Sequence, residues 1–301
     1  MERPESTLFA LLGTQEGKDL LRWCGGRTMR SQLLGFRNQK NDLVIDVGSL
    51  DGSDAILFAQ ATKLRVWTFE PSPSKHAGIR EKLARAAVTD TVTLYPFAIS
   101  NRTGEATLEL LRASGAKARR FMGNGFGSSG DLLTQVERPV GLPPGNATEL
   151  VRVPVRRLDD LVNISERIAF LKVDAQGQDL LVLRGAERLL ANQRVGTLKI
   201  EFSPFLMPGR TTGALAGLRW LEQLGYRCAP CHASRAIFVD RSKPMSVDAF
   251  VGVYRGSQTA YDDIVCRTCC ACTSTAKARR GKEKGQHSGM LSCCKCDQGG
   301  S

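Results

Sequence analysis

The chain has 301 residues, 42% of them hydrophobic and 24% charged, and a formal net charge of +12 at pH 7. These proportions are ordinary for a globular protein and exclude collagen, wholesale disorder and a coiled coil. The length fits one domain with appendages. The sequence has no apolar run long enough to cross a bilayer and its N-terminus lacks a signal-peptide pattern, so we expect a soluble chain in the cytoplasm.

The predicted elements begin with an N-terminal helical lead-in over residues 1–39, where apolar side chains recur at helical spacing. The β-branched run at 42–48 is typical of a strand buried on both faces of a parallel sheet. A second strand is expected at 64–69. Ser72 and Pro73 predict the start of the helix that follows it, as an N-cap and a first-turn proline.

Strands and helices continue to alternate along the rest of the chain. Residues 91–99 predict a third strand with 107–111 folding back beside it, and the glycine-rich segment 113–130 predicts a loop. Further strands are expected at 151–155, 168–173, 197–202, 236–240 and 250–254, and helices at 55–61, 179–190 and 215–224. This alternation predicts a doubly wound α/β fold, with a mostly parallel sheet and helices on both faces.

The first predicted strand ends in the pattern Asp-x-Gly-x-x-x-Gly, from Asp46 to Gly52. Glycines let the chain turn sharply and approach a ligand where a parallel sheet opens. Glu70 ends the next strand, where a carboxylate can accept hydrogen bonds from two ribose hydroxyls. Because the turn is not G-x-G-x-x-G, an adenosine ligand with a compact tail, such as S-adenosylmethionine, fits better than a dinucleotide. The structural alternatives are a glycine needed only for the turn and an exposed strand-end acid.

Several further motifs, in collinear order between residues 40 and 255, resemble the FkbM-type S-adenosylmethionine-dependent methyltransferases. They are Val44-Ile-Asp-Val-Gly48, Thr68-Phe-Glu-Pro71, 98–107, 153–161, Leu171-Lys-Val-Asp-Ala-Gln-Gly177 and 182–190. The resemblance implies a class I methyltransferase (Rossmann-like) sheet and transfer of a methyl group, usually to a hydroxyl oxygen. One position departs from the family, because Gln176 stands where the family usually has a glutamate.

The resemblance also assigns Asp46, Gly48 and Glu70 to the cofactor site by matching motif positions. With the neighbouring positions added, the expected S-adenosylmethionine site consists of Asp46, Gly48, Ser49, Gly52, Glu70, Pro71 and Ala98. No residue is assigned to a metal.

Two carboxylates are the candidate catalytic residues. Asp174 and Glu201 end neighbouring predicted strands at the same edge as the cofactor turn. They would act as base and orienter for a hydroxyl acceptor, or would ligate a divalent cation through oxygen. The alternative is structural, with Asp174 capping the next helix and Glu201 paired with Lys172 or Lys199. His232 would reach the pocket or lie in a surface loop.

The expected acceptor is a hydroxyl of a small molecule or carbohydrate. Asp174 is followed by Ala-Gln-Gly rather than by the proline–proline–aromatic run that stacks a flipped base, so nucleic acid is not favoured. The rival hypothesis is a non-catalytic protein that keeps the fold and contacts nucleic acid or another acidic partner. It would do so through the basic loop Lys117-Ala-Arg-Arg120 and the C-terminal tail. Oligomeric state is not predicted.

The predicted domain spans residues 40–258 and is followed by a cysteine-rich basic tail over 259–301. Seven of the ten cysteines lie in the last 36 residues, whereas the rest of the chain resembles a reduced cytosolic protein. The tail is expected to be a disordered appendage. Zinc bound by Cys266-x-x-Cys269 and Cys293-x-x-Cys296, and lipidated cysteines at a membrane surface, are the alternatives.

Overall fold

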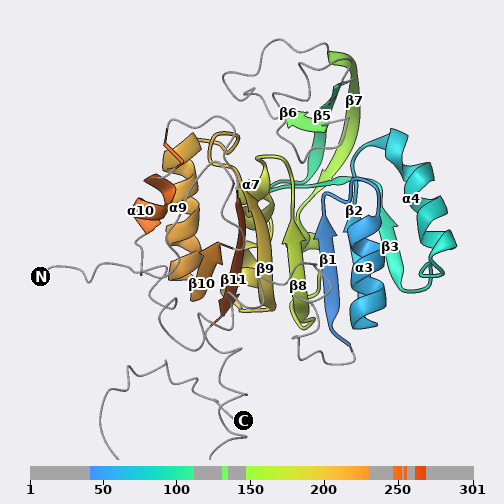
Figure 1. The fold of residues 1–301 in the computed structure, drawn as a ribbon, viewed down its shortest axis with the longest axis horizontal. Coiled ribbons are helices and arrows are strands. Elements are labelled where there is room, and N and C mark those ends of the chain that lie inside the picture. Colours follow the sequence, from blue (N-terminus) through green and yellow to red (C-terminus); the bar gives the residue numbers. More distant parts are fainter. Residues whose placement is uncertain are drawn as a thin grey trace, which may run out of the picture.

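The computed structural model describes residues 41–111, 131–134, 147–230, 247–252, 254–255 and 262–268. Its main body is a seven-stranded sheet in the order β10-β11-β9-β8-β1-β2-β3 (Figure 1). Four segments predicted from the sequence lie outside the described residues: the lead-in 1–39, the loop 113–130, the strand 236–240 and the tail from 269 onward.

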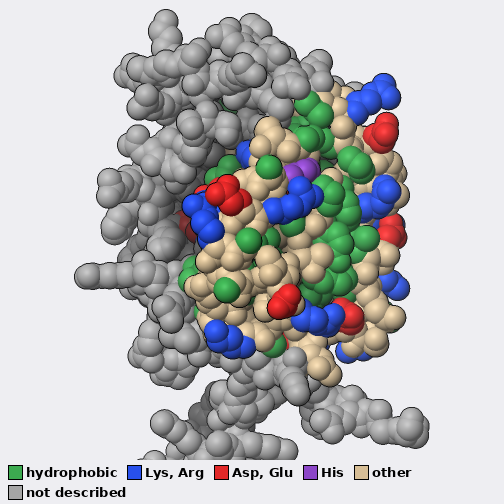
Figure 2. Space-filling model, turned by 90° about the vertical axis from the view of Figure 1, so that its right-hand side faces the viewer, with side chains coloured by type: hydrophobic (Ala, Val, Ile, Leu, Met, Phe, Trp, Pro, Cys, Tyr) green, Lys and Arg blue, Asp and Glu red, His purple; other side chains and the backbone are tan. Residues whose placement is uncertain are grey.

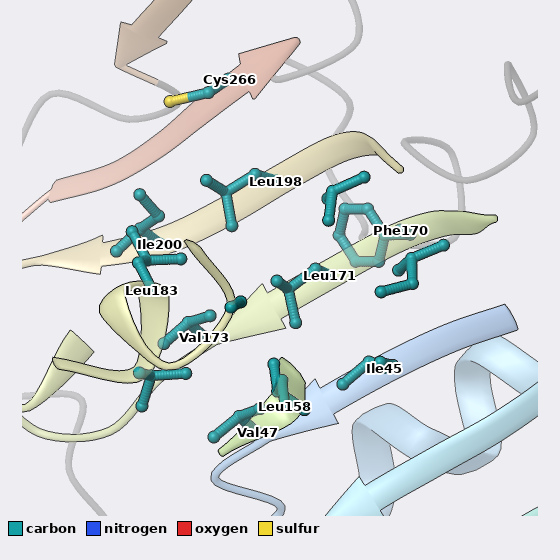
Figure 3. Packing of buried hydrophobic residues seen from close by; sticks show 14 of the residues in the cluster. Ile45, Val47, Leu158, Phe170, Leu171, Val173, Leu183, Leu198, Ile200 and Cys266 are labelled. Carbon is teal, nitrogen blue, oxygen red and sulfur yellow. The ribbon is translucent and has the colours of Figure 1, made fainter. Parts of the chain in front are cut away.

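Five strands of this sheet run parallel to one another: β1 (Leu43–Val47), β2 (Arg65–Phe69), β3 (Val92–Tyr95), β8 (Ile168–Val173) and β9 (Val195–Phe202). Every residue of β1 and β8 is buried, which is what a continuous apolar run in a parallel sheet predicts. Figure 3 shows the buried side chains of these strands, with Leu183 of the next helix among them. The predicted doubly wound α/β fold is confirmed.

The helices connect and cover the strands: α3 (Ser53–Thr62), α4 (Pro73–Arg85), α6 (Leu158–Leu161), α7 (Asp179–Arg184), α8 (Glu187–Ala191), α9 (Arg210–Gln223) and α10 (Val247–Gly252). The prediction of a single helix over 179–190 is wrong, because the helix is interrupted between α7 and α8. At the break, a Cβ on Gly185 would lie 2.0 Å from the Ser100 carbonyl oxygen. Among the described helices, none combines the length and apolar character needed to cross a membrane.

A second sheet, which the sequence did not predict, projects beyond the carboxyl ends of β1 and β8 (Figure 1). Its order is β4-β7-β5-β6, from β4 (Ala98–Ile99), β5 (Gly104–Leu111), β6 (Asp131–Thr134) and β7 (Ala147–Arg156). The single strand predicted at 91–99 is wrong, because the strand is interrupted at Pro96, which has no backbone N–H, and continues in another sheet. The strand predicted beside it, β5, pairs instead with β6 and β7.

An antiparallel pair, β10 (Tyr226–Pro230) and β11 (Asp262–Thr268), forms one edge of the main sheet, where β11 also pairs with β9. The strand predicted at 250–254 is wrong: Phe250 lies in α10, where its ring stacks on Phe202 at 5.5 Å. A short apolar run does not distinguish a strand from a buried helix. The main sheet thus extends past the expected domain end at residue 258. The sequence prediction missed this strand because cysteines and basic residues surround its buried Ile264 and Val265.

Cys228 and Cys266 form a disulfide that joins β10 to β11, across 38 positions of sequence. The two residues face each other in the strand register and both are buried. Cys266 is therefore not available for the zinc alternative, and the expectation of reduced cysteines is wrong for this pair.

The face at the β3 edge of the main sheet, seen in Figure 2, carries mixed charge. Lys and Arg side chains alternate there with Asp and Glu side chains and with hydrophobic groups. Ion pairs such as Lys82 with Asp51 and Arg85 with Glu81 join oppositely charged neighbours. The net positive charge of the chain therefore does not concentrate on this described face.

Candidate active site

The turn between β1 and α3 is built on glycines with positive φ angles, 85° at Gly48 and 81° at Gly52. The N–H groups of Gly48 and Ser49 both donate to the Phe69 carbonyl, at 3.1 and 3.0 Å. A Cβ on Gly48 would lie 1.9 Å from the Asp174 carbonyl oxygen. Gly48 is thus required both by its backbone angle and by the close approach of the Asp174 backbone.

Glu70, directly after β2, is buried rather than an exposed strand-end acid. Its Oε2 accepts the Leu50 N–H at 2.8 Å, and its Oε1 accepts the Ser72 N–H at 2.9 Å. The Lys75 ammonium lies 4.0 Å from the same carboxylate, and the His76 ring hydrogen-bonds to the Glu70 carbonyl at 2.7 Å. Two backbone donors therefore hold this carboxylate between the glycine turn and the start of α4.

The same turn carries a buried hydroxyl whose hydrogen-bonding capacity is not met within the described protein. Ser49 is 4% exposed, and its Oγ has no hydrogen-bond partner among the described residues. Buried polar atoms are normally satisfied, so this one fits contact with a polar ligand. Together with the fixed Glu70 carboxylate, Ser49 fits S-adenosylmethionine, which carries ribose hydroxyls and a charged amino-acid end.

Asp46 lies beneath the turn and is fully buried. Its Oδ2 accepts the Thr68 hydroxyl at 2.8 Å, and its Oδ1 lies 3.3 Å from Lys172 Nζ. The same ammonium lies 3.0 Å from Asp54 and 3.4 Å from Asp174. Both oxygens of Asp46 are thus engaged within the protein, and its contact with a cofactor stays a prediction.

Lys172 is a site residue whose role the sequence reasoning missed. Burial alone would lower the pKa of its ammonium, but the carboxylates of Asp46, Asp174 and Asp54 outweigh burial and raise that pKa well above its ordinary value. Burial raises the pKa of Asp46, against the attraction of Lys172. The available signal was the adjacency of β1 and β8, because Asp46 and Lys172 face each other in that register.

The other two predicted cofactor residues occupy different surroundings. Pro71 is half-buried and directly follows Glu70 at the end of β2. Ala98 belongs to β4 of the second sheet, where it is buried in a small cluster with Ala106 and Val155. Cofactor contact by either residue stays a prediction.

The two residues of the predicted catalytic pair lie beside each other, and the Gln176 amide contacts both. The Gln176 amide nitrogen lies 3.0 Å from Asp174 Oδ1 and 3.3 Å from Glu201 Oε2. The structural alternatives for the pair are wrong in detail. The Asp179 carboxylate, not that of Asp174, accepts the loop N–H groups before α7, and Lys199 pairs with Asp263 at 2.8 Å rather than with Glu201.

The two carboxyl groups differ in exposure. Burial raises the pKa of Glu201 to about 10, and the negative charges of Asp174 and Asp179 add to this effect. Burial likewise raises the pKa of Asp179 to about 7. Glu201 therefore carries its proton at neutral pH. The side chain of Asp174 is 35% exposed, which makes it the more accessible carboxyl of the pair.

Metal binding finds no support in this part of the chain. Among the residues that the structure describes, no group of three or more His, Cys, Asp or Glu side chains is placed to hold a metal ion. His232, which the sequence placed near the pocket or in a surface loop, lies outside the described residues.

Comparison with known proteins gives a family match and several weaker likenesses. The sequence matches the Methyltransferase FkbM domain family over residues 46–228. It is 26% identical over 174 residues to the 2-O-methyltransferase NoeI of Sinorhizobium fredii, an alignment that covers 54% of this chain and only 65% of that protein. This chain thus spans less than two thirds of that relative's length.

Two solved structures are also similar. Methyltransferase FkbM from Methylobacillus flagellatus has a TM-score of 0.45 at 16% identity, over 77% of this chain and 45% of that one. An rRNA methylase from Streptococcus thermophilus has a TM-score of 0.41 at 11% identity, over 80% of this chain and 93% of that one. The family match includes Asp46, Glu70, Asp174 and Glu201.

Proposed function

The chain belongs to the FkbM methyltransferase family, and on that premise we propose that it transfers a methyl group from S-adenosylmethionine to a hydroxyl oxygen of a small molecule or sugar. One observation carries the proposal, the contact between the glycine turn and the segment after β8. The Asp174 N–H donates to the Val47 carbonyl at 3.0 Å, and the Asp174 carbonyl packs against Gly48. An accessible carboxylate therefore adjoins the turn proposed to bind the cofactor.

In this proposal Glu70, Ser49 and the backbone around Gly48 hold S-adenosylmethionine, which supplies a methyl group already activated on a sulfonium. The buried Glu70 carboxylate accepts hydrogen bonds from ribose hydroxyls, since its orientation is set by two backbone N–H groups. The glycines of the turn let the backbone approach the ligand. What remains for the protein is to orient the acceptor oxygen and to take its proton.

Asp174 is the proposed base. Lys172 lies 3.4 Å from its Oδ2 and the Gln176 amide 3.0 Å from its Oδ1, so both oxygens are held in fixed orientation. When the acceptor oxygen bonds to the methyl carbon, the methyl–sulfur bond would break and S-adenosylhomocysteine would be released, while the hydroxyl proton would pass to the Asp174 carboxylate and then to solvent. Glu201 keeps its proton throughout, because burial holds its pKa at about 10.

The acceptor is proposed to be uncharged. Asp174 and Asp179 bring carboxyl groups to this edge of the sheet, and a carboxylate beside the acceptor repels phosphate and carboxylate groups. A neutral hydroxyl compound meets no such repulsion. The similarity of the chain to a 2-O-methyltransferase supports a hydroxyl group as the acceptor. Neither this similarity nor the family match indicates which molecule carries that hydroxyl.

Binding of S-adenosylmethionine tests the cofactor half of the proposal. Isothermal titration should give a saturable site in the wild type, and Glu70→Gln should weaken it about 10- to 100-fold, which is the loss expected for hydrogen bonds to a charged group. Glu81→Gln is the matched control, because its side chain lies on α4 and is 69% exposed. Equal affinity in both variants would contradict the assignment of Glu70.

Methyl transfer tests the chemical half. S-adenosylmethionine with a radiolabelled methyl group is incubated with a panel of sugars and small hydroxyl compounds, and S-adenosylhomocysteine is measured alongside the label. Asp174→Asn should lower kcat by about 10²- to 10⁴-fold while leaving S-adenosylmethionine affinity unchanged. Cofactor binding without transfer to any hydroxyl would favour the non-catalytic alternative.

A further inference from the structure

The amide of Gln176, which contacts the proposed base, also contacts a second carboxyl group of the candidate active site. Its nitrogen is within hydrogen-bond distance of both carboxyl groups, 3.0 Å from Asp174 Oδ1 and 3.3 Å from Glu201 Oε2. A glutamine amide has two N–H donors, so each carboxyl receives one and the donor capacity is fully used. The amide thus forms a bridge between the accessible carboxyl and the buried one.

The backbone around Gln176 is fixed in the shape that this bridge requires. Gln176 has a φ of 53°, in the left-handed region that residues with a Cβ seldom adopt. Gly177 follows at 92°, and a Cβ there would lie 2.6 Å from Leu206. The Asp179 carboxylate accepts the N–H groups of Ala175 and Gly177, both at 2.9 Å. Such a conformation persists only where its surroundings over-determine it, and such positions cluster at functional sites.

We propose that Gln176 is a positioning residue, whose amide ties Asp174 to Glu201 and orients Asp174 to take the acceptor proton. The inference rests on the proposed function, in which Asp174 is the base. It adds that the neutral amide is needed at this position. A carboxylate in its place would lose both donors and add a negative charge to an acidic cluster.

The charges around Asp174 set the direction of that effect. The titratable groups that interact with Asp174 are Lys172 of β8, Asp179 of α7 and Glu201 of β9. Lys172 is shared with Asp46 of β1 and Asp54 of α3, and Asp263 of β11, which interacts with Glu201, is paired with Lys199 of β9. Two lysines thus stand among five carboxyl groups besides Asp174. A further carboxylate disfavours the ionised form of its neighbours, so the Asp174 carboxyl would titrate at a higher pH.

The test compares Gln176→Glu and Gln176→Met with the control Gln193→Glu. Gln193 has nearly the same backbone angle, a φ of 52°, and lies in an exposed turn before β9, at the opposite end of the strand from Glu201. Side-chain carboxyl signals of ¹³C-labelled protein are followed by NMR against pH, and Asp174→Asn identifies the Asp174 signal. Gln176→Glu should raise the Asp174 midpoint by about one pH unit or more, whereas Gln193→Glu should leave it unchanged.

The kinetic arm uses the acceptor found in the methyl-transfer screen. The acid limb of kcat/KM should move to higher pH in Gln176→Glu by the same amount as the NMR midpoint. Gln176→Met, which removes the donors without adding charge, should lower kcat about 10-fold with the KM for S-adenosylmethionine within about twofold of wild type.

Two outcomes overturn the inference. One is an Asp174 titration that is the same in Gln176→Glu and Gln193→Glu. The other is a Gln176→Met protein with wild-type kcat and wild-type Asp174 signals. If Gln176→Glu fails to fold, as judged by circular dichroism, Gln176→Met decides by the same signals. If the variants show the NMR effect but the wild type methylates no hydroxyl compound, the proposed function has failed while the inference about the Gln176 bridge stands.

Discussion

Replacing Lys172 by methionine tests the charge network beneath the glycine turn. The ammonium lies 3.3 Å from Asp46, 3.0 Å from Asp54 and 3.4 Å from Asp174. Asp46 is fully buried, and the Thr68 hydroxyl would be its one remaining side-chain partner among the described residues. Removing one member of a buried ion pair costs about 3–5 kcal/mol, because the other charge stays buried without compensation. We therefore expect Lys172→Met to lower the free energy of unfolding by about that amount at pH 7.

The sign of the pH dependence follows from Asp46. Without Lys172, burial holds the pKa of Asp46 in the folded state above its value in the unfolded chain, so the folded protein retains a proton that the unfolded chain releases. Stability of Lys172→Met should accordingly be greatest at low pH and should fall as pH rises, which makes its deficit larger at pH 8 than at pH 5. Urea unfolding at these two pH values measures both quantities.

Two further variants make the reasoning refutable. Adding Asp46→Asn to Lys172→Met removes the uncompensated carboxylate and should recover at least about 1 kcal/mol, within the range expected for residues in contact. Lys82→Met breaks the exposed pair with Asp51 and should cost less than about 1 kcal/mol. If Lys172→Met costs no more than Lys82→Met, or if Asp46→Asn recovers nothing, the network does not hold the turn as argued.

Three other outcomes follow from the same structure. Glu201 has a folded-state pKa of about 10 against an ordinary 4.5, so wild-type stability should fall as pH rises between these values. Glu201→Gln should therefore gain stability over wild type with rising pH, by up to about 1.4 kcal/mol per unit in urea unfolding, and a constant difference would contradict that protonation state. Replacing Cys228 and Cys266 by serine removes a link across 38 positions and should cost about 4 kcal/mol, while an unchanged midpoint with and without reductant would refute the bond. Gly48→Ala should cost about 2 kcal/mol or more and abolish S-adenosylmethionine binding, whereas Gly78→Ala, where a Cβ meets nothing within 4 Å, should not destabilise the protein.

Local pattern was sufficient for the parallel half of the sheet. The β-branched run that ends at Gly48 predicts β1 to within a residue or so, because strands buried on both faces are apolar throughout. Local pattern could not predict the second sheet, because β4 and β7 are far apart in sequence and neither segment indicates that it pairs with the other. The strand around Ile264 was hidden for a different reason, as its cysteine and basic neighbours resemble a tail.

The candidate site divides along the same line. Glu70 and Asp174 were predictable because each directly follows a strand, and the carboxyl ends of parallel strands meet at one edge. The bridge made by Gln176 was not, because it depends on a left-handed backbone that only the folded loop imposes. The ion pair between Lys172 and Asp46 depends on the register between two strands more than a hundred residues apart, and local sequence pattern does not determine that register.

The location of charge separates the two hypotheses for function. The chain carries +12 overall, yet at the candidate active site Lys172 and Lys199 are buried and each is paired with carboxylates. Binding of a phosphate backbone requires accessible Lys and Arg side chains and weakens steeply with salt. The basic loop at 117–120 and the tail, which would supply such side chains, lie outside the described residues. Nucleic-acid binding through those segments should therefore disappear at high ionic strength, whereas methyl transfer to a neutral hydroxyl beside Asp174 should persist.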